Sequence, residues 1–73
     1  MEENFDREYY IAALCENLPY EDMSDEIYFS SLNDAIDKTI CDYRKDGSLF
    51  VEDWDMFDQD LYNNAYKILE SRS

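Results

Sequence analysis

Residues 16–26 read ENLPYEDMSDE, and along this stretch one helical pattern ends and the next begins. Pro19 ends the first pattern, because proline has no N–H to donate and biases the residue before it away from helical geometry. Ser24 and Ser30 are both candidates to cap the second pattern. The stretch contains five carboxylates and no lysine or arginine, so it projects negative charge into solvent. It therefore connects two helices and is a candidate interaction surface.

Apolar residues at three- and four-residue spacing predict helices over about 5–17, 24–45 and 52–71. The apolar stripes of these helices consist of Tyr10, Ala13, Leu14 and Leu18; of Tyr28, Leu32, Ile36, Ile40 and Tyr43; and of Trp54, Phe57, Leu61, Ala65 and Ile68. The predicted fold class is all-α, a compact bundle of about three helices. A chain of 73 residues makes at most one domain, here 1–73.

The ends of these helices have their own signals. Asn4 is the candidate cap of the first helix. Whether residues 24–30 begin one long helix or form a separate turn stays open. Gly47 marks the end of the second helix, since a left-handed glycine often follows a helix. Residues 48–51 are expected to be a brief extended connection that forms no sheet by itself.

Nineteen acidic residues against six basic ones give a net charge of −13. Direct binding to nucleic acid is disfavoured, because proteins need lysine and arginine to displace its counterions. The expected partner is a basic protein surface, and the commonest large basic clefts are those that bind DNA or RNA. Hydrophobic residues at 45% of the chain are too many for a disordered acidic tail, so the chain should fold.

The sequence favours a soluble protein of the cytoplasm. Its longest apolar run, residues 9–15, is much shorter than the roughly 20 residues of a transmembrane helix, and its N-terminus lacks the positive region of a signal peptide. Cys15 and Cys41 are the only cysteines. Both lie in apolar helical patterns and are expected to be small core residues.

Catalysis is not expected. Acid–base chemistry by paired carboxylates needs a cleft that separates two pKa values, and a chain this small offers little desolvation. The sequence contains no histidine and one glycine, so it lacks a histidine base and a glycine-rich phosphate loop. We expect no cofactor and no metal.

A calcium site is the sharpest alternative for residues 42–53, which resemble an EF-hand loop between two helices. Asp42, Asp46 and Asp53 fall at the first, fifth and last positions of such a loop. Arg44 places a cation where an oxygen ligand is needed, and an aspartate ends the loop where a longer bidentate glutamate is usual. A helix stop followed by glycine explains the segment better.

Mimicry of DNA is the leading hypothesis for the acidic excess. Acids three or four residues apart on a helix have Cβ atoms about 5–6 Å apart, close to the spacing of phosphates along a strand. A solvated face that only keeps the protein soluble explains any one acid better, but it explains the excess of thirteen less well. The candidate partner-binding acids are Glu16, Glu21, Asp22, Asp25, Glu26, Asp34, Asp37, Glu52, Asp55 and Asp58.

Residues 9–43 resemble the N-terminal part of the Ocr-type phage antirestriction proteins, which mimic B-form DNA. The resemblance rests on ENLPYEDM at residues 16–23 and on Asp34-Ala35-Ile36. It implies an all-helical, DNA-shaped surface that blocks the DNA-binding groove of type I restriction–modification enzymes and related phage defences. The acids that the match carries over are Glu16, Glu21, Asp22, Asp25, Asp34 and Asp37. This chain lacks the long acidic tail of that family. Whether it forms the family's dimer, and how long a duplex it mimics, therefore stay open.

The sequence thus predicts a phage-encoded anti-defence inhibitor that occupies the basic DNA site of a host restriction or other defence enzyme. A homodimer would imitate a longer stretch of duplex than one protomer. Two alternatives stay open, an acidic interaction module that resembles an immunity protein or antitoxin, and a degenerate EF-hand-like calcium binder. The identity of the target and the oligomeric state do not follow from the sequence.

Overall fold

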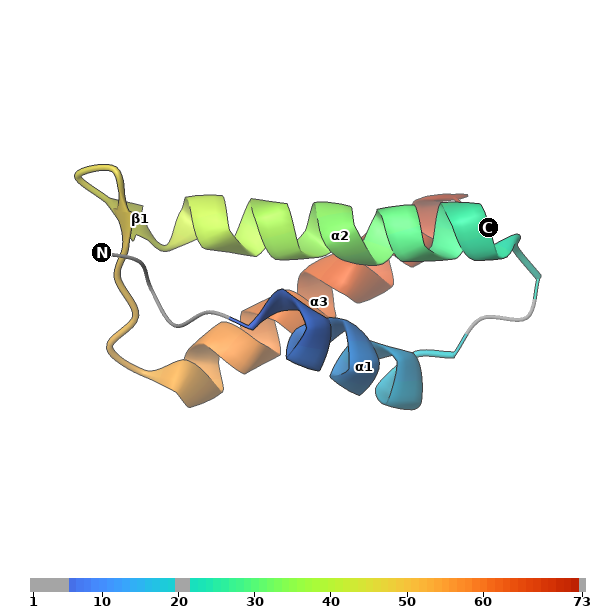
Figure 1. Ribbon diagram of the computed structural model, residues 1–73, viewed down its shortest axis with the longest axis horizontal. Coiled ribbons are helices and arrows are strands. Elements are labelled where there is room, and N and C mark those ends of the chain that lie inside the picture. Colours follow the sequence, from blue (N-terminus) through green and yellow to red (C-terminus); the bar gives the residue numbers. More distant parts are fainter. Residues whose placement is uncertain (1–5, 20–21, 73) are drawn as a thin grey trace.

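A computed structural model describes residues 6–19 and 22–72, which form three α-helices and one small hairpin. The order along the chain is α1 (Arg7–Asn17), α2 (Asp25–Asp42), β1 (Arg44–Lys45), β2 (Ser48–Leu49) and α3 (Trp54–Arg72). Helix α2 runs along the molecule, α3 crosses it obliquely, and α1 lies on the side nearest the viewer (Figure 1). The shape is elongated, with extents of 38 × 20 × 19 Å. The predicted all-α class is confirmed.

Short polar side chains begin each helix. The carboxylate of Asp6 accepts a hydrogen bond from the Tyr9 N–H at 3.2 Å and caps α1; the expected cap, Asn4, lies outside the described residues. Ser24 Oγ accepts from the Ile27 N–H at 3.3 Å, so Ser24 caps α2. Helix α2 is therefore one continuous helix that passes through Ser30. Each such cap satisfies an N–H that has no partner within the helix.

The predicted end of the second helix was wrong. Helix α2 stops at Asp42, and Arg44 and Lys45 form β1, which pairs antiparallel with β2. The intervening Asp46 and Gly47 have φ values of 54° and 82°, and positive φ at both central residues is what a type I′ hairpin turn requires. Gly47 thus serves a hairpin turn and not the end of a helix. Ser48 and Leu49 are extended as expected, and they form a sheet only by pairing with β1.

The core lies mainly between α2 and α3, with α1 covering one side. Its buried residues are Leu14, Tyr28, Leu32, Ala35, Ile36, Phe57, Leu61, Ala65 and Leu69. One position of the predicted stripe of α3 was wrong, since Trp54 is 46% exposed. Ile68 packs against the core as expected, and Leu69 beside it is fully buried. Trp54 sits at the first position of the helix, beyond the end of the core, and its ring packs edge-on against Phe57.

Hydrogen bonds from side chains tie the helices together. The Tyr28 hydroxyl donates to the Leu18 carbonyl at 2.8 Å, joining α2 to the end of α1. The Tyr43 hydroxyl donates to Asp60 at 2.6 Å, joining the end of α2 to α3. Asn64 Nδ2 donates to Thr39 Oγ1 at 2.8 Å within the α2–α3 interface. These bonds satisfy polar groups that packing removes from water.

The cysteines differ from expectation. Both thiols are free, Cys15 is half-buried against the core, and Cys41 is exposed on α2. The assignment of Cys41 to the core was therefore wrong: its neighbours Ile40 and Tyr43 pack against the core, but Cys41 lies off the buried stripe of α2. None of the described helices is long and apolar enough to cross a membrane.

Candidate functional site

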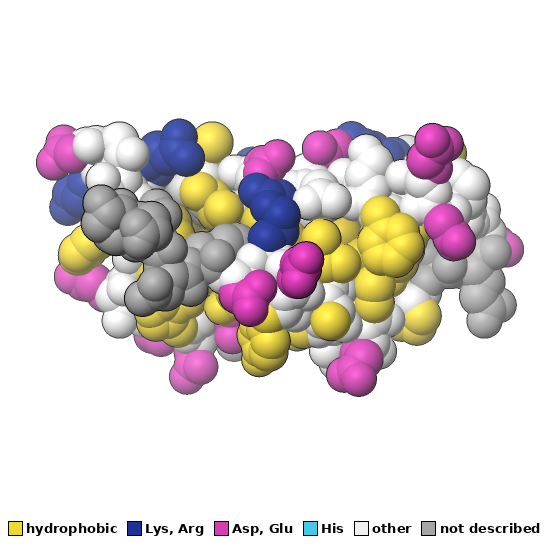
Figure 2. All heavy atoms as spheres, viewed as in Figure 1, with side chains coloured by type: hydrophobic (Ala, Val, Ile, Leu, Met, Phe, Trp, Pro, Cys, Tyr) yellow, Lys and Arg dark blue, Asp and Glu magenta, His cyan; other side chains and the backbone are white. Residues whose placement is uncertain are grey.

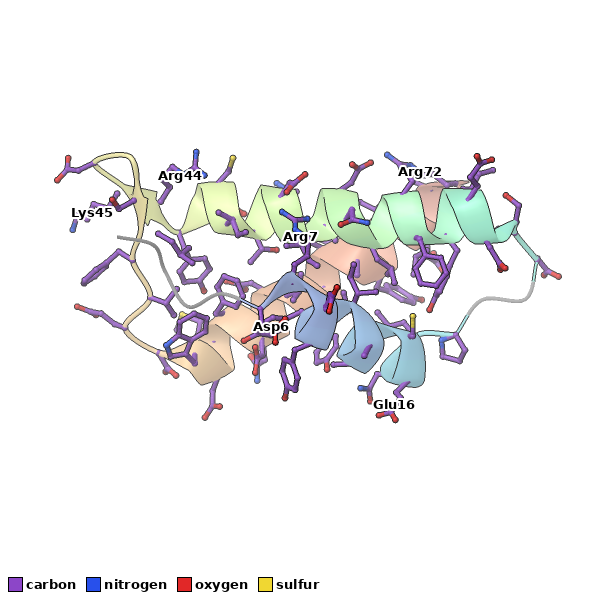
Figure 3. The ribbon with its side chains drawn as sticks, viewed as in Figure 1. Asp6, Arg7, Glu16, Arg44, Lys45 and Arg72 are labelled. Carbon is purple, nitrogen blue, oxygen red and sulfur yellow. The ribbon has the colours of Figure 1, made fainter. Side chains whose placement is uncertain are left out.

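One end of the molecule carries exposed carboxylates around the α1–α2 connection (Figures 1 and 3). We define the connector acids as Glu16, Asp22, Asp25 and Glu26, all of which are exposed. Glu16 lies in the last turn of α1, Asp22 lies in the connection, and the other two lie in the first turn of α2. Glu21, the remaining predicted acid of this stretch, lies outside the described residues.

The local structure explains why these acids point outward. The Leu18 N–H closes the last turn of α1 on the Leu14 carbonyl at 2.7 Å, and the Leu18 carbonyl accepts the Tyr28 hydroxyl. The end of α1 is thereby tied to α2. Asp25 and Glu26 lie beside the positive end of the α2 dipole, which stabilises each charge by about 0.3–1 kcal/mol. Their positions therefore also favour the helix, independently of any partner.

Asp34 and Asp37, in contrast, are paired with arginines. Asp34 lies 2.8 Å from the Arg72 guanidinium, and Asp37 lies 2.7 Å from that of Arg7. Both carboxylates remain about half exposed, but each contact cancels charge that a basic partner would otherwise meet. The sequence places these two acids among the mimicry residues, and the structure gives each a role in joining α2 to another helix.

Asp58 faces the inside of the molecule. Its Oδ1 atom is buried and, among the described residues, has no hydrogen-bond partner. Burial, followed by the charge of Asp58 and a hydrogen bond to it, raises the pKa of Tyr10 to about 12. Burial and the same carboxylate also raise the pKa of Tyr62. Asp58 thus belongs to a polar contact between α1 and α3 and presents little charge to a partner.

Glu52 and Asp55 are exposed at the far end of the molecule, next to the hairpin. Glu52 lines a surface hollow together with Lys45, which forms with Arg44 the only pair of adjacent cations in the chain. Figure 3 shows both cations at the hairpin end and Glu16 toward the opposite end. Glu52 and Asp55 therefore lie at the other end of the molecule from the connector acids.

The distribution of charge is consequently uneven along the molecule. Figure 2 shows acidic side chains spread over the face drawn, some of them beside a basic side chain near its centre. Among the described residues, Arg72 lies near the connector end and is neutralised by Asp34, while Lys67 is exposed along α3. The connector end thus brings together four of the predicted acids, all of them exposed.

The EF-hand interpretation of residues 42–53 finds no support in the geometry. Asp42 is the last residue of α2 and lies 3.9 Å from Lys38. Asp46 is in the hairpin turn, and the Asp53 carboxylate accepts hydrogen bonds from the first N–H groups of α3. Within residues 6–19 and 22–72, no three acidic or cysteine side chains are placed to hold a metal ion.

The sequence did not reveal a shallow groove beside the connector acids. It has a volume of about 520 Å³ and is lined by Glu26, Ile27, Ser30 and Arg72. The groove forms where the last turn of α3 passes the first turns of α2, and no local pattern indicates which residues of two distant helices will meet. The exposed Ile27 was the one available signal, since it interrupts the polar face of α2.

Comparisons of the chain with models of known protein families, with curated proteins and with solved structures find no match.

Proposed function

We propose that this protein is a non-catalytic inhibitor that places its connector acids in the basic DNA-binding cleft of a host defence enzyme, such as a restriction enzyme. It acts by competition, occupying the place of the nucleic acid. The observation that carries the proposal is the group of exposed carboxylates at one end of an elongated molecule, with the exposed cations Arg44 and Lys45 at the other end.

The size of the molecule is consistent with this function. Its long axis of 38 Å is close to one turn of duplex, about 34–36 Å. With about one phosphate per 1.7 Å of axis, that length of DNA carries roughly 22 charges, a number similar to the nineteen carboxylates of the chain. Because two of the predicted acids are paired with arginine and Asp58 faces inward, the imitation is best at the connector end.

An interaction module that binds one basic protein is the second candidate. The observation that favours it is the presence of exposed apolar side chains beside the acids, including Ile27 at 46% exposure and Phe29 at 42%. A mimic of DNA needs only charge, whereas recognition of a single partner depends on a few desolvated contacts. The two candidates differ in one respect: the DNA mimic must compete with DNA for its partner, whereas the interaction module need not.

The test captures binding proteins from host lysate on the immobilised full chain, with and without competing duplex DNA. We expect the captured protein to bind DNA by itself and to be released by the duplex. We also expect its affinity for the chain to fall steeply between about 50 and 200 mM salt, as for DNA itself. A captured protein that duplex DNA fails to release would overturn the proposal and favour the interaction module.

A further inference from the structure

The groove beside the connector acids combines an apolar floor with an acidic rim. Ile27 supplies exposed aliphatic surface, Ser30 lies one turn further along α2, and Glu26 stands at the edge as an exposed carboxylate. Its volume of about 520 Å³ lies within the range of sites that accept small side chains or ligands. The groove thus differs from the purely charged surface around it.

Arg72 forms the opposite wall and does not make the groove cationic. One guanidinium nitrogen lies 2.8 Å from Asp34, and the other donates to Ser31 Oγ at 3.1 Å. The paired guanidinium is fixed in direction, so its aliphatic stem is available to line the groove. Because Asp34 balances this charge, the rim is dominated by Glu26 and the adjacent Asp25.

We propose that the groove takes one apolar side chain of about leucine size from a basic segment of the partner protein. Lysine or arginine residues next to that side chain would then meet Glu26 and Asp25. Charge complementarity points to this occupant, since the rim would repel an acidic segment and would not attract a neutral one. The inference rests on the proposed function, in which the connector end meets a basic protein surface.

This apolar contact gives the interaction a property that charge alone lacks. Screening by salt weakens exposed ion pairs, but burial of an aliphatic side chain changes little with ionic strength. It also provides selectivity among basic proteins, because attraction between opposite charges discriminates weakly and a filled apolar pocket discriminates by shape. Part of the affinity is therefore expected to persist at high salt.

The test uses two synthetic lysine-rich peptides that differ only at one central position, leucine or serine. Each is titrated into the isotopically labelled full chain, with binding followed by NMR. We expect the leucine peptide to bind about tenfold more tightly than the serine peptide. Contacts are expected between the leucine methyl groups and Ile27. Ile27→Asn should remove the difference, while Met56→Asn should preserve it, since Met56 is similarly exposed but lies in the first turn of α3.

Equal affinity of the two peptides for the native chain overturns the inference, and so does an Ile27→Asn variant that keeps the tenfold difference. If Ile27→Asn instead changes the sedimentation of the free chain, the groove is an interface between two copies and the inference fails. These failures are separate from failure of the proposed function. If the two peptides bind equally and lose affinity with salt, the groove inference fails but binding of basic partners by the connector acids stands. The proposed function fails when duplex DNA does not release the captured partner.

Discussion

The guanidinium of Arg72 lies 2.8 Å from the carboxylate of Asp34 and joins the last turn of α3 to the middle of α2. The same guanidinium donates to Ser31, which in turn donates to the Ile27 carbonyl at 2.7 Å. This contact closes one side of the groove and neutralises one of the acids that the sequence assigned to mimicry. A single pair thus affects both packing and the surface charge.

Arg72→Ala should lower the free energy of unfolding by about 0.5–1 kcal/mol, since both members of the pair are partly exposed and solvent screens the attraction. Urea denaturation monitored by circular dichroism measures the change. Lys38→Ala provides the control, because the contact of Lys38 with Asp42 is longer at 3.9 Å and more exposed. An equal or larger loss in the control would show that the Arg72 contact has no special role in stability.

Loss of the Phe57 side chain should be the most damaging of the core changes. Phe57 is fully buried, and its ring lies edge-on to those of Tyr10, Tyr43 and Trp54 at centroid distances of 5.9, 5.1 and 5.1 Å. We expect Phe57→Ala to cost about 3–5 kcal/mol, a large part of the stability of a small domain. Met56→Ala, at the exposed neighbouring position, should change stability by less than about 0.5 kcal/mol. Thermal unfolding distinguishes the two variants.

Stability should fall at high pH because of the tyrosines. The hydrogen bond to Asp60 is the main cause that raises the pKa of Tyr43 to about 12, and burial is the main cause that raises the pKa of Tyr10 to about 12. The folded state therefore holds these protons more tightly than the unfolded state, in which the pKa is about 10. Their contribution is complete below pH of about 10 and is lost as the pH rises toward about 12.

Urea denaturation at a series of alkaline pH values tests this dependence. Tyr43→Phe removes the ionisable hydroxyl that binds Asp60, so its stability should decline less between pH of about 10 and 12 than that of the native chain. Tyr66→Phe is a control, because Tyr66 is 51% exposed. A decline of the same slope in all three proteins would contradict the assignment of the effect to Tyr43.

The hairpin turn should resist substitution at Gly47. The residue has φ of +82°, and an added Cβ would meet no atom within 4 Å, so the cost of Gly47→Ala comes from the backbone alone. We expect a loss of about 1–2 kcal/mol in the stability of the turn. Asp46→Asn should be tolerated, since asparagine accepts the left-handed conformation that Asp46 adopts. Chemical shifts of residues 44–49 report whether the hairpin persists.

The sequence predicted the helices well because their signals are local. Periodic apolar residues located α2, and the Ser24 cap and Pro19 bounded the α1–α2 connection. The hairpin was also readable, since Asp46-Gly47 is a strong signal for a two-residue turn. It was missed because Arg44 and Lys45 suit the C-terminal end of a helix equally well, and that interpretation extended α2 by three residues beyond Asp42.

The site was less predictable, since it depends on how the helices cross. Arg7 meets Asp37 and Arg72 meets Asp34 across long sequence separations, so no pattern within one helix shows that these acids are paired. The inward direction of Asp58 likewise follows from the approach of α1 to α3. The connector acids, in contrast, lie within one short stretch of the chain, so the sequence alone groups them. They are consequently the predicted acids that the structure also places, exposed, at one end of the molecule.

The central claim is that the connector acids, and not the overall charge, occupy a basic DNA site. It is tested most directly with two variants of equal net charge, Asp22→Asn/Glu26→Gln at the connector end and Glu52→Gln/Asp55→Asn at the hairpin end. For each, the measurement is the concentration needed to displace labelled duplex DNA from the captured partner. We expect the connector variant to require at least about tenfold more protein than the native chain, and the hairpin variant to differ from it by less than about threefold. Equal weakening of the two variants would contradict the claim.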